Sequence, residues 1–216
     1  MRSLVLCNRI AIRYVAEQSS GGAGRRFCSA TTNTGGGRGK EKVVVIMGAT
    51  GTGKSKLSID LAAGLPPGEV VNSDKMQVYA ALDVTTNKIT AAERRGVPHH
   101  LLGDLDPAAG ELSPAGFRDL GGAAVSDIAA RRRLPIVAGG SNSFIHALLA
   151  DDPYDPAIDT FAAPGKAPAA PATAAPARLR YRCCLLWVDV AAGVLYEHLD
   201  RRVEEMVGAG MVEELA

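Results

Sequence analysis

Residues 43–55 read Val-Val-Val-Ile-Met-Gly-Ala-Thr-Gly-Thr-Gly-Lys-Ser, and this stretch decides the fold. Its first five residues form an apolar run rich in β-branched side chains, which predicts a strand buried on both faces of a parallel sheet. The next eight match the pattern G-x-x-x-x-G-K-[S/T] at every fixed position. Residues 54–63 then carry apolar side chains on one side of a helix. This order of strand, glycine-rich loop and helix predicts a site for a di- or triphosphate.

The loop contains three kinds of group that attract phosphate oxygens. Its glycines let backbone N–H groups turn inward, where they act together with the N-terminus of the following helix. Lys54 adds a positive charge for the outer phosphates, and the hydroxyl of Ser55 is a candidate ligand for Mg²⁺. The predicted phosphate-binding residues are Gly48, Ala49, Thr50, Gly51, Thr52, Gly53, Lys54 and Ser55. The loop alone does not specify a reaction.

Strand and helix patterns alternate along the rest of the chain. We expect strands at 69–72, 134–138 and 180–188, and helices at 114–132, 143–150 and 190–208. This alternation predicts an α/β fold with a parallel sheet flanked by helices, like that of P-loop NTPases, which binds ligands at the carboxyl ends of the strands. Asp74 and Ser141 each follow a predicted strand, so we expect both at the same edge as the phosphate-binding loop.

Composition divides the chain into four parts. Residues 1–40 contain seven basic residues and one acid among many Ser, Thr and Gly, which is typical of a disordered organellar transit peptide, with a plain basic tail as the alternative. Residues 41–150 form the predicted α/β core. Residues 151–180 are a linker or insertion, because 13 of the 16 residues at 162–177 are Ala or Pro. Residues 181–216 return to the core. We therefore expect a chloroplast or mitochondrial protein, or a cytoplasmic one if the first segment does not target it.

Charge and cysteine content argue against several classes. The whole chain has 24 basic and 23 acidic residues, but residues 41–216 keep 17 and 22, a net charge of −5. An acidic body is poorly suited to binding nucleic acid by neutralising phosphates. The basic run at 131–133 more often caps a helix C-terminus. The four cysteines lack metal-ligand spacing, the pair at 99–100 fits a structural histidine pair better than a metal site, and no stretch is apolar enough to span a membrane.

Four motifs in a fixed order resemble the isopentenyltransferase family, most closely the plant adenylate isopentenyltransferases, which are cytokinin synthases. They are the loop at 48–55, Asn-Ser-Asp-Lys-Met-Gln-Val-Tyr at 72–79, Val-Pro-His-His-Leu-Leu-Gly at 97–103, and Leu-Pro-Ile-Val-Ala-Gly-Gly-Ser-Asn-Ser at 134–143. The resemblance covers residues 43–150 and 180–216. It implies transfer of a dimethylallyl group from dimethylallyl diphosphate to N6 of the adenine in AMP, ADP or ATP, with Mg²⁺.

The resemblance also assigns roles to individual residues. Asp74 corresponds to the base that accepts the proton of the adenine amine, Thr50 to the residue that reaches the bridging oxygen of the diphosphate, and Lys54 to the cation that stabilises the leaving group. The residues expected to bind the acceptor are Gln77, Thr86, Lys88, Ser141 and Asn142. Without the resemblance, Asp74 would be interpreted as a magnesium carboxylate or a helix N-cap.

Other functions and some departures from the family stay open. The alternatives are a tRNA dimethylallyltransferase, a small-molecule kinase with the same loop, and a remnant that only binds phosphate. Ala81 stands where the family has glycine, and it would strain the turn if its φ were positive. Family members continue well beyond Ala216, so we expect a truncated chain of low activity. The expected last helix has four apolar positions without a covering element, Val203, Met206, Val207 and Met211.

Overall fold

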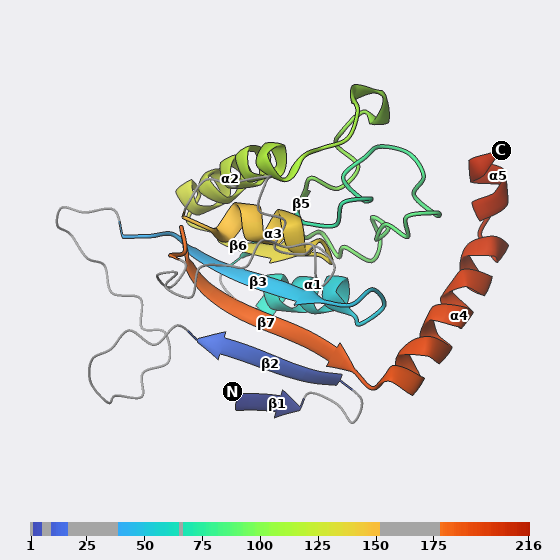
Figure 1. The fold of residues 1–216 in the computed structure, drawn as a ribbon, viewed down its shortest axis with the longest axis horizontal. Helices are drawn as coiled ribbons and strands as arrows, with labels where there is room; N and C mark the ends of the chain where they lie inside the picture. The colour runs from blue at the N-terminus through green and yellow to red at the C-terminus, as the bar shows by residue number, and fades with distance from the viewer. Residues whose placement is uncertain (1, 6–9, 17–38, 65–66, 152–177) are drawn as a thin grey trace, which may run out of the picture.

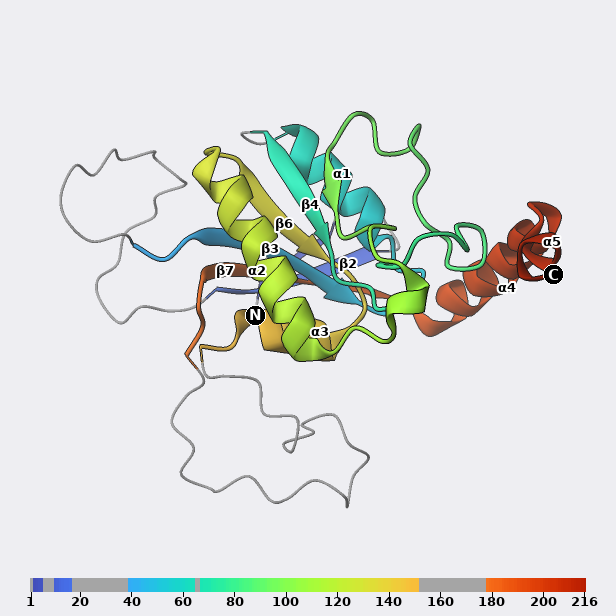
Figure 2. The ribbon, with the colours of Figure 1, turned by 90° about the horizontal axis from the view of Figure 1, so that it is seen from above.

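One seven-stranded sheet with helices on both faces makes up the protein (Figures 1 and 2). The computed structural model describes residues 2–5, 10–16, 39–64, 67–151 and 178–216. The strand order is β1-β2-β7-β3-β6-β4-β5. The strands are β1 (Arg2–Val5), β2 (Ile10–Ala16), β3 (Lys42–Gly48), β4 (Gly68–Asn72), β5 (His99–His100), β6 (Leu134–Ala138) and β7 (Arg182–Val190).

The five strands from β7 to β5 pair in parallel, as the alternation of strands and helices predicted. β3, which leads into the phosphate-binding loop, lies between β7 and β6, with Val45 opposite Leu185 on one side and Val137 on the other. A central strand with neighbours on both edges holds the start of the loop in a fixed place. The predicted α/β fold is confirmed.

Three α-helices cover the two faces of the sheet, and two more lie to one side of it. They are α1 (Lys54–Gly64), α2 (Pro114–Ala130), α3 (Asn142–Leu149), α4 (Ala192–Gly208) and α5 (Met211–Leu215), with a 3-10 turn η1 (Pro107–Ala109). The predicted start of α2 is confirmed, because the Ser113 hydroxyl accepts a hydrogen bond from the Gly116 N–H at 3.0 Å and Pro114 occupies the first turn.

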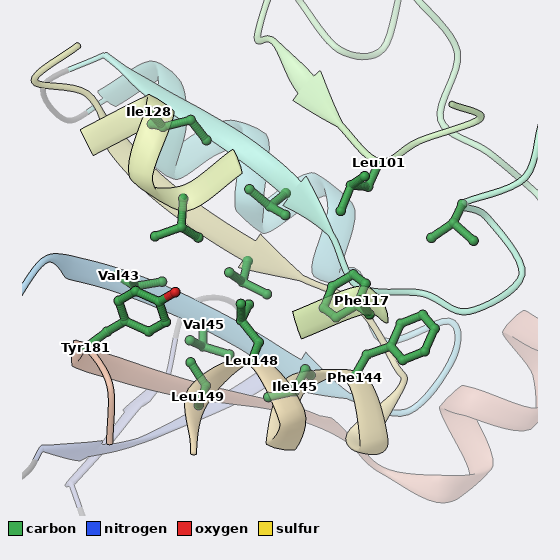
Figure 3. Close-up of a cluster of buried hydrophobic side chains, with 14 residues drawn as sticks. Val43, Val45, Leu101, Phe117, Ile128, Phe144, Ile145, Leu148, Leu149 and Tyr181 are labelled. Atoms are coloured by element: carbon green, nitrogen blue, oxygen red, sulfur yellow. The ribbon is translucent and has the colours of Figure 1, made fainter. Parts of the chain in front are cut away.

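Alternate residues of each strand feed two separate hydrophobic clusters. Val45, Val71 and Val137 face α2 and α3, where the rings of Phe117 and Phe144 stack with centroids 4.3 Å apart (Figure 3). The neighbouring strand residues Ile46, Val70 and Ile136 face α1. Burial on both faces is what the continuous apolar strands predicted.

Part of the predicted transit segment is ordered as strand. β2 pairs antiparallel with β7, and β1 pairs antiparallel with β2, where composition predicted disorder. The physical reason is twofold: residues 10–15 read Ile-Ala-Ile-Arg-Tyr-Val, which favours a strand, and β7 offers an edge of unpaired backbone groups. A transit function for residues 1–40 stays a prediction, and the Ala/Pro-rich stretch at 162–177 lies outside the described residues.

The last two helices differ from the rest of the chain. α4 and α5 lie to one side of the sheet (Figures 1 and 2), and none of their residues is buried. Two of the predicted uncovered positions, Val203 and Val207, are 53% and 48% exposed, while Met206 and Met211 are half-buried. No helix in the described part of the chain is long and apolar enough to cross a membrane.

Candidate active site

A cavity of about 660 Å³ lies at the carboxyl ends of the parallel strands, where the fold predicts a ligand. Three groups of residues form its walls: the phosphate-binding loop, the chain that follows β4, and α4. The lining residues used below are Thr50, Lys54, Ser55, Asn72, Asp74, Gln77, Thr86, Lys88, Gly139, His198, Arg202 and Glu205. Segments more than 140 residues apart in the sequence therefore share one cavity.

The phosphate-binding loop has the conformation that its glycines predicted. Gly51 and Gly53 have φ values of 81° and 87°. The buried Thr52 hydroxyl donates a hydrogen bond to the Ala49 carbonyl at 2.8 Å, and the Lys54 ammonium donates to the same carbonyl at 2.7 Å. Of the eight predicted loop residues, Thr50, Gly51, Gly53, Lys54 and Ser55 line the cavity. The other three, Gly48, Ala49 and Thr52, support the loop from outside it.

Lys54 is the cation closest to the chemistry that the resemblance implies. Burial lowers the pKa of its ammonium, the carboxylate of Asp74 raises it, and the guanidinium of Arg202 lowers it, so the pKa lies below 10.5. A partly desolvated ammonium with a second cation nearby favours binding of an anion between them. That is the electrostatic requirement of a diphosphate site.

Asp74 sits on a turn that directly follows β4 and is held by two neighbours. Its backbone N–H donates to the Asn72 side-chain oxygen at 3.2 Å, and its Oδ1 accepts from the Met76 N–H at 3.0 Å. A Cβ atom on Gly140 would lie 3.9 Å from both Asp74 Oδ2 and Lys54 Nζ. One carboxylate oxygen is therefore used by a turn, with no helix beginning there, and the other lies on the same side as Lys54.

The chain after β6 passes so close to the chain after β4 that residue 139 must be glycine. A Cβ atom on Gly139 would lie 2.3 Å from the carbonyl carbon of Ser73, a distance that real Cβ atoms do not show. This contact fixes the chain after β6 against the turn that carries Asp74. The motif at 134–143 thus supports the turn that carries Asp74, and its Gly139 also lines the cavity.

The predicted acceptor-binding residues separate into two groups. Gln77, Thr86 and Lys88 line the cavity, whereas Ser141 and Asn142 do not belong to its lining and instead begin α3. The Gln77 amide donates to the Thr86 and Asn87 carbonyls at 2.9 and 3.0 Å, so it holds the wall of the cavity. The Lys88 side chain is only 4% exposed, and its ammonium pairs with Asp83 at 3.0 Å and with the Ala81 carbonyl. Their role toward an acceptor stays a prediction.

Sequence reasoning missed the part of the site that α4 provides. His198, Arg202 and Glu205 line the cavity at helical spacing, one and two turns apart. The helix reaches this position by packing on the loop, since a Cβ atom on Gly51 would lie 2.9 Å from Leu199 Cδ2. The i, i+4, i+7 spacing of these polar side chains in the sequence could have indicated that one face of α4 lines the site. On the exposed side of α4, Arg201 pairs with Glu205 at 3.8 Å.

The cavity fits Mg²⁺ only in combination with a phosphate ligand. In the described part of the chain, no group of three or more His, Cys, Asp or Glu side chains is arranged to hold a metal ion. Ser55 offers a hydroxyl oxygen in the lining next to Lys54, and Asp74 would offer a carboxylate only if it were a metal ligand instead of the base. Magnesium commonly binds through one or two protein oxygens and the oxygens of a phosphate substrate, so this donor set suits it.

Comparison with known proteins agrees with this geometry. The sequence profile of the IPP transferase family matches residues 77–160. An adenylate isopentenyltransferase from Humulus lupulus is 58% identical over 171 residues, which is 79% of this chain and 50% of that protein. A chloroplastic adenylate isopentenyltransferase from Arabidopsis thaliana is 53% identical, over 82% of this chain and 47% of that protein. The chain spans about half the length of these curated relatives.

A solved structure extends the comparison to the fold. The full-length tRNA isopentenylpyrophosphate transferase of Bacillus halodurans is 30% identical, with a TM-score of 0.61 over 81% of this chain and 69% of that chain. The fold and the phosphate-binding cavity define a P-loop protein with a parallel sheet. Within that class, the chain belongs to the IPP transferase family.

Proposed function

We propose that this protein transfers a dimethylallyl group from dimethylallyl diphosphate to N6 of the adenine in AMP, ADP or ATP, the reaction that starts cytokinin synthesis. The observation that carries the proposal is that Asp74 and Lys54 line the same cavity, with Asp74 Oδ2 and Lys54 Nζ both 3.9 Å from the position of a Cβ atom on Gly140. A base for the nucleophile and a cation for the leaving group within one cavity are what a displacement at an allylic carbon requires.

The phosphate-binding loop acts on the leaving group. As the bond between the allylic carbon and the diphosphate oxygen breaks, negative charge grows on the diphosphate. Lys54 and the loop N–H groups stabilise that charge, and Thr50, which lines the cavity, is the residue to which we assign contact with the bridging oxygen. A Mg²⁺ ion held by Ser55 would neutralise further charge on the diphosphate when bound.

Asp74 acts on the nucleophile. The N6 lone pair is delocalised into the adenine ring, so the amine attacks well only if its proton is removed as the new carbon–nitrogen bond forms. Asp74 Oδ2 would accept that proton, while the Met76 N–H holds Oδ1 and keeps the carboxylate oriented. The proton stays on the protein until solvent removes it.

Two features favour a free adenine nucleotide over tRNA as the acceptor. The two adenylate enzymes above share more than half of their aligned residues with this chain, against 30% for the tRNA enzyme. Residues 41–216 also carry a net charge of −5, which opposes binding to the many phosphates of a tRNA.

One assay tests the proposal and its alternatives together. The full chain is incubated with labelled dimethylallyl diphosphate, Mg²⁺ and either AMP, ADP, ATP or undermodified tRNA, and the labelled product is identified. Prenylated nucleotide is the expected result. Label in tRNA alone would assign the chain to the tRNA enzymes, and label in neither acceptor would contradict the transferase function.

The location in the cell is a separate proposal. Relatives from Arabidopsis thaliana carry the words chloroplastic or mitochondrial in their names. We propose that residues 1–40, rich in Arg, Ser and Thr, direct this chain to one of these organelles. Import of a fluorescent protein fused after residue 40 is the test, and cytosolic fluorescence would contradict it.

A further inference from the structure

The last helix contacts the cavity wall through a single carboxylate. Glu214, in α5, accepts hydrogen bonds from the backbone N–H groups of Val84 at 3.0 Å and Thr85 at 2.6 Å. These partners are 130 and 129 residues away in the sequence. Contact over this separation joins the end of the described chain to the segment between β4 and β5.

The segment that Glu214 contacts has the shape of one helical turn. The Thr86 N–H bonds to the Leu82 carbonyl at 3.0 Å, and the Lys88 N–H bonds to the Asp83 carbonyl at 2.9 Å. The first N–H groups of such a turn have no partner inside it, and their dipoles point outward with partial positive charge. A carboxylate placed there satisfies both needs, and Glu214 provides it from another part of the chain.

Electrostatics agree with this contact. Burial raises the pKa of Glu214, but the hydrogen bonds from the backbone N–H groups of Thr85 and Val84 outweigh it, and the pKa lies below its ordinary value. The carboxylate is therefore charged at neutral pH, which is the form that accepts both hydrogen bonds.

The Glu214 contact lies between two elements that line the cavity, the turn and α4. Residues 85–88 line one wall of the cavity. The Gln77 amide donates hydrogen bonds to the carbonyls of Thr86 and Asn87 in this wall. Arg202, in α4, lines the opposite wall. Glu214 is the hydrogen-bonded link between α5, which continues α4, and the turn. The Glu214 contact therefore ties the end of α4 and α5 to the wall formed by residues 85–88.

We propose that Glu214 is a positioning residue, which caps the turn at 82–88 and so sets the wall against which the acceptor binds. It touches no substrate and acts through the backbone of Val84 and Thr85. The acceptor in this statement is the adenine nucleotide of the proposed function, on which it rests. The phosphate-binding loop, which packs on the other end of α4, does not depend on the Glu214 contact.

Hydrogen exchange tests the cap without any need for activity. In the full chain, Glu214→Ala should speed exchange of the Val84 and Thr85 amides by about tenfold or more, because a charge-assisted partner of both is lost. Glu214→Gln keeps one acceptor oxygen and should give an intermediate rate. Glu213→Ala is the matched control, since it removes an equal charge from the preceding residue, and it should leave both amides unchanged. Unchanged exchange in Glu214→Ala would overturn the proposal.

Ligand binding then separates positioning from a purely structural role. Calorimetry should show that Glu214→Ala weakens AMP binding by about tenfold while inorganic pyrophosphate binds as it does to the unmodified chain. Equal loss for both ligands, or no loss for AMP, would overturn the positioning role. If the unmodified chain binds no adenine nucleotide, the proposed function fails, and the exchange rates still decide whether Glu214 caps the turn.

Discussion

Two carboxylates, on β4 and directly after it, have opposite environments. Glu69 is 1% exposed and accepts hydrogen bonds from Arg131 at 3.0 Å and Arg133 at 2.7 Å, with His100 at 2.6 Å. Asp74, five residues later, lines the open cavity, and of its two oxygens only Oδ1 is held by the turn. One carboxylate is surrounded by partners, and the other has an oxygen available.

The difference separates a carboxylate that stabilises the fold from the one that the proposed mechanism uses as a base. Burial raises the pKa of Glu69, but hydrogen bonds from Arg131, Arg133 and His100 outweigh it and lower the pKa to about 2. A carboxylate bound this tightly cannot take up a proton at neutral pH. Proton transfer needs the less complete environment of Asp74.

The largest expected effect comes from Asp74→Asn, which keeps the oxygen that accepts from Met76. Turnover should fall by roughly 10²- to 10⁴-fold, the usual range for loss of a general base, while stability changes by less than about 0.5 kcal/mol. Steady-state assay and thermal melting measure the two. Asp106→Asn is the control, because Asp106 accepts the same type of bond from Ala108 at 2.9 Å outside the cavity lining. Unchanged turnover with weaker Mg²⁺ binding would make Asp74 a metal carboxylate.

Glu69→Gln should lower stability and leave the site intact, the reverse of the effect expected for Asp74→Asn. It leaves two guanidinium groups without their shared counter-charge and should cost about 3 kcal/mol of unfolding free energy, with pyrophosphate binding unaffected. Urea denaturation measures the loss. Glu111→Gln is the control, since Glu111 forms an exposed pair with Lys75 and its loss should change stability far less.

The same carboxylate makes a prediction about acid. The pKa of Glu69 is about 2 in the folded chain against an ordinary value of 4.5, so its contribution is fully present above pH 4.5 and is lost as the pH falls toward 2. Stability measured by denaturation between pH 5 and pH 2.5 should fall less steeply in Glu69→Gln. If the stability of the unmodified chain and of Glu69→Gln fell in parallel with pH, the lowered pKa of Glu69 would be contradicted.

A smaller effect is expected on the cation that faces Asp74. Lys54→Ala should weaken pyrophosphate binding by ten- to a hundredfold, about 2 kcal/mol, because one charge-assisted contact is lost. It should slow prenyl transfer as well, since the charge grows on the leaving group. Lys42→Ala, at the other end of β3, is the control for net charge. Loss of nucleotide affinity alone would place the nucleotide in the loop and favour a kinase.

The smallest effect concerns backbone strain beside the cavity. Ala81, which stands where the family has glycine, has a φ of 60°, so the positive φ that would strain alanine is present. Leu82 and Asn87 nearby have φ values of 50°. Ala81→Gly should stabilise the chain by about 0.5 to 1 kcal/mol, because the gain in the folded state exceeds the added freedom of the unfolded chain. Ala80→Gly is the control and should destabilise. A lower melting temperature for Ala81→Gly would contradict the strain.

Local patterns predicted the parallel sheet and one side of the cavity. The loop at 48–55 and Asp74 are each placed by the strand that precedes them, so a reader of the sequence can locate both. The structural role of the pair at 99–100 was also correct, because His99 donates to the Val97 carbonyl at 2.8 Å and His100 contacts Glu69.

Features set by tertiary packing were not predictable in this way. The position of Arg202 depends on Leu199 packing against Gly51, and nothing near either residue indicates that contact. The ammonium of Lys88 pairs with Asp83 and the Ala81 carbonyl, partners that sequence reasoning did not indicate, and its contact with the acceptor stays a prediction. The basic run at 131–133 was interpreted as a helix C-cap, and Arg131 does cap α2. The main partner of Arg131 is nevertheless the buried carboxylate of Glu69 in β4.

The position of β7 has a consequence for synthesis of the chain. β3, β4 and β6 can pair with one another once residue 138 has left the ribosome, but β7 completes the other edge of β3 only after residue 190. Until then the strand that leads into the phosphate-binding loop is a sheet edge, open to pairing with other chains. Chaperone dependence during translation should therefore end abruptly once β7 emerges.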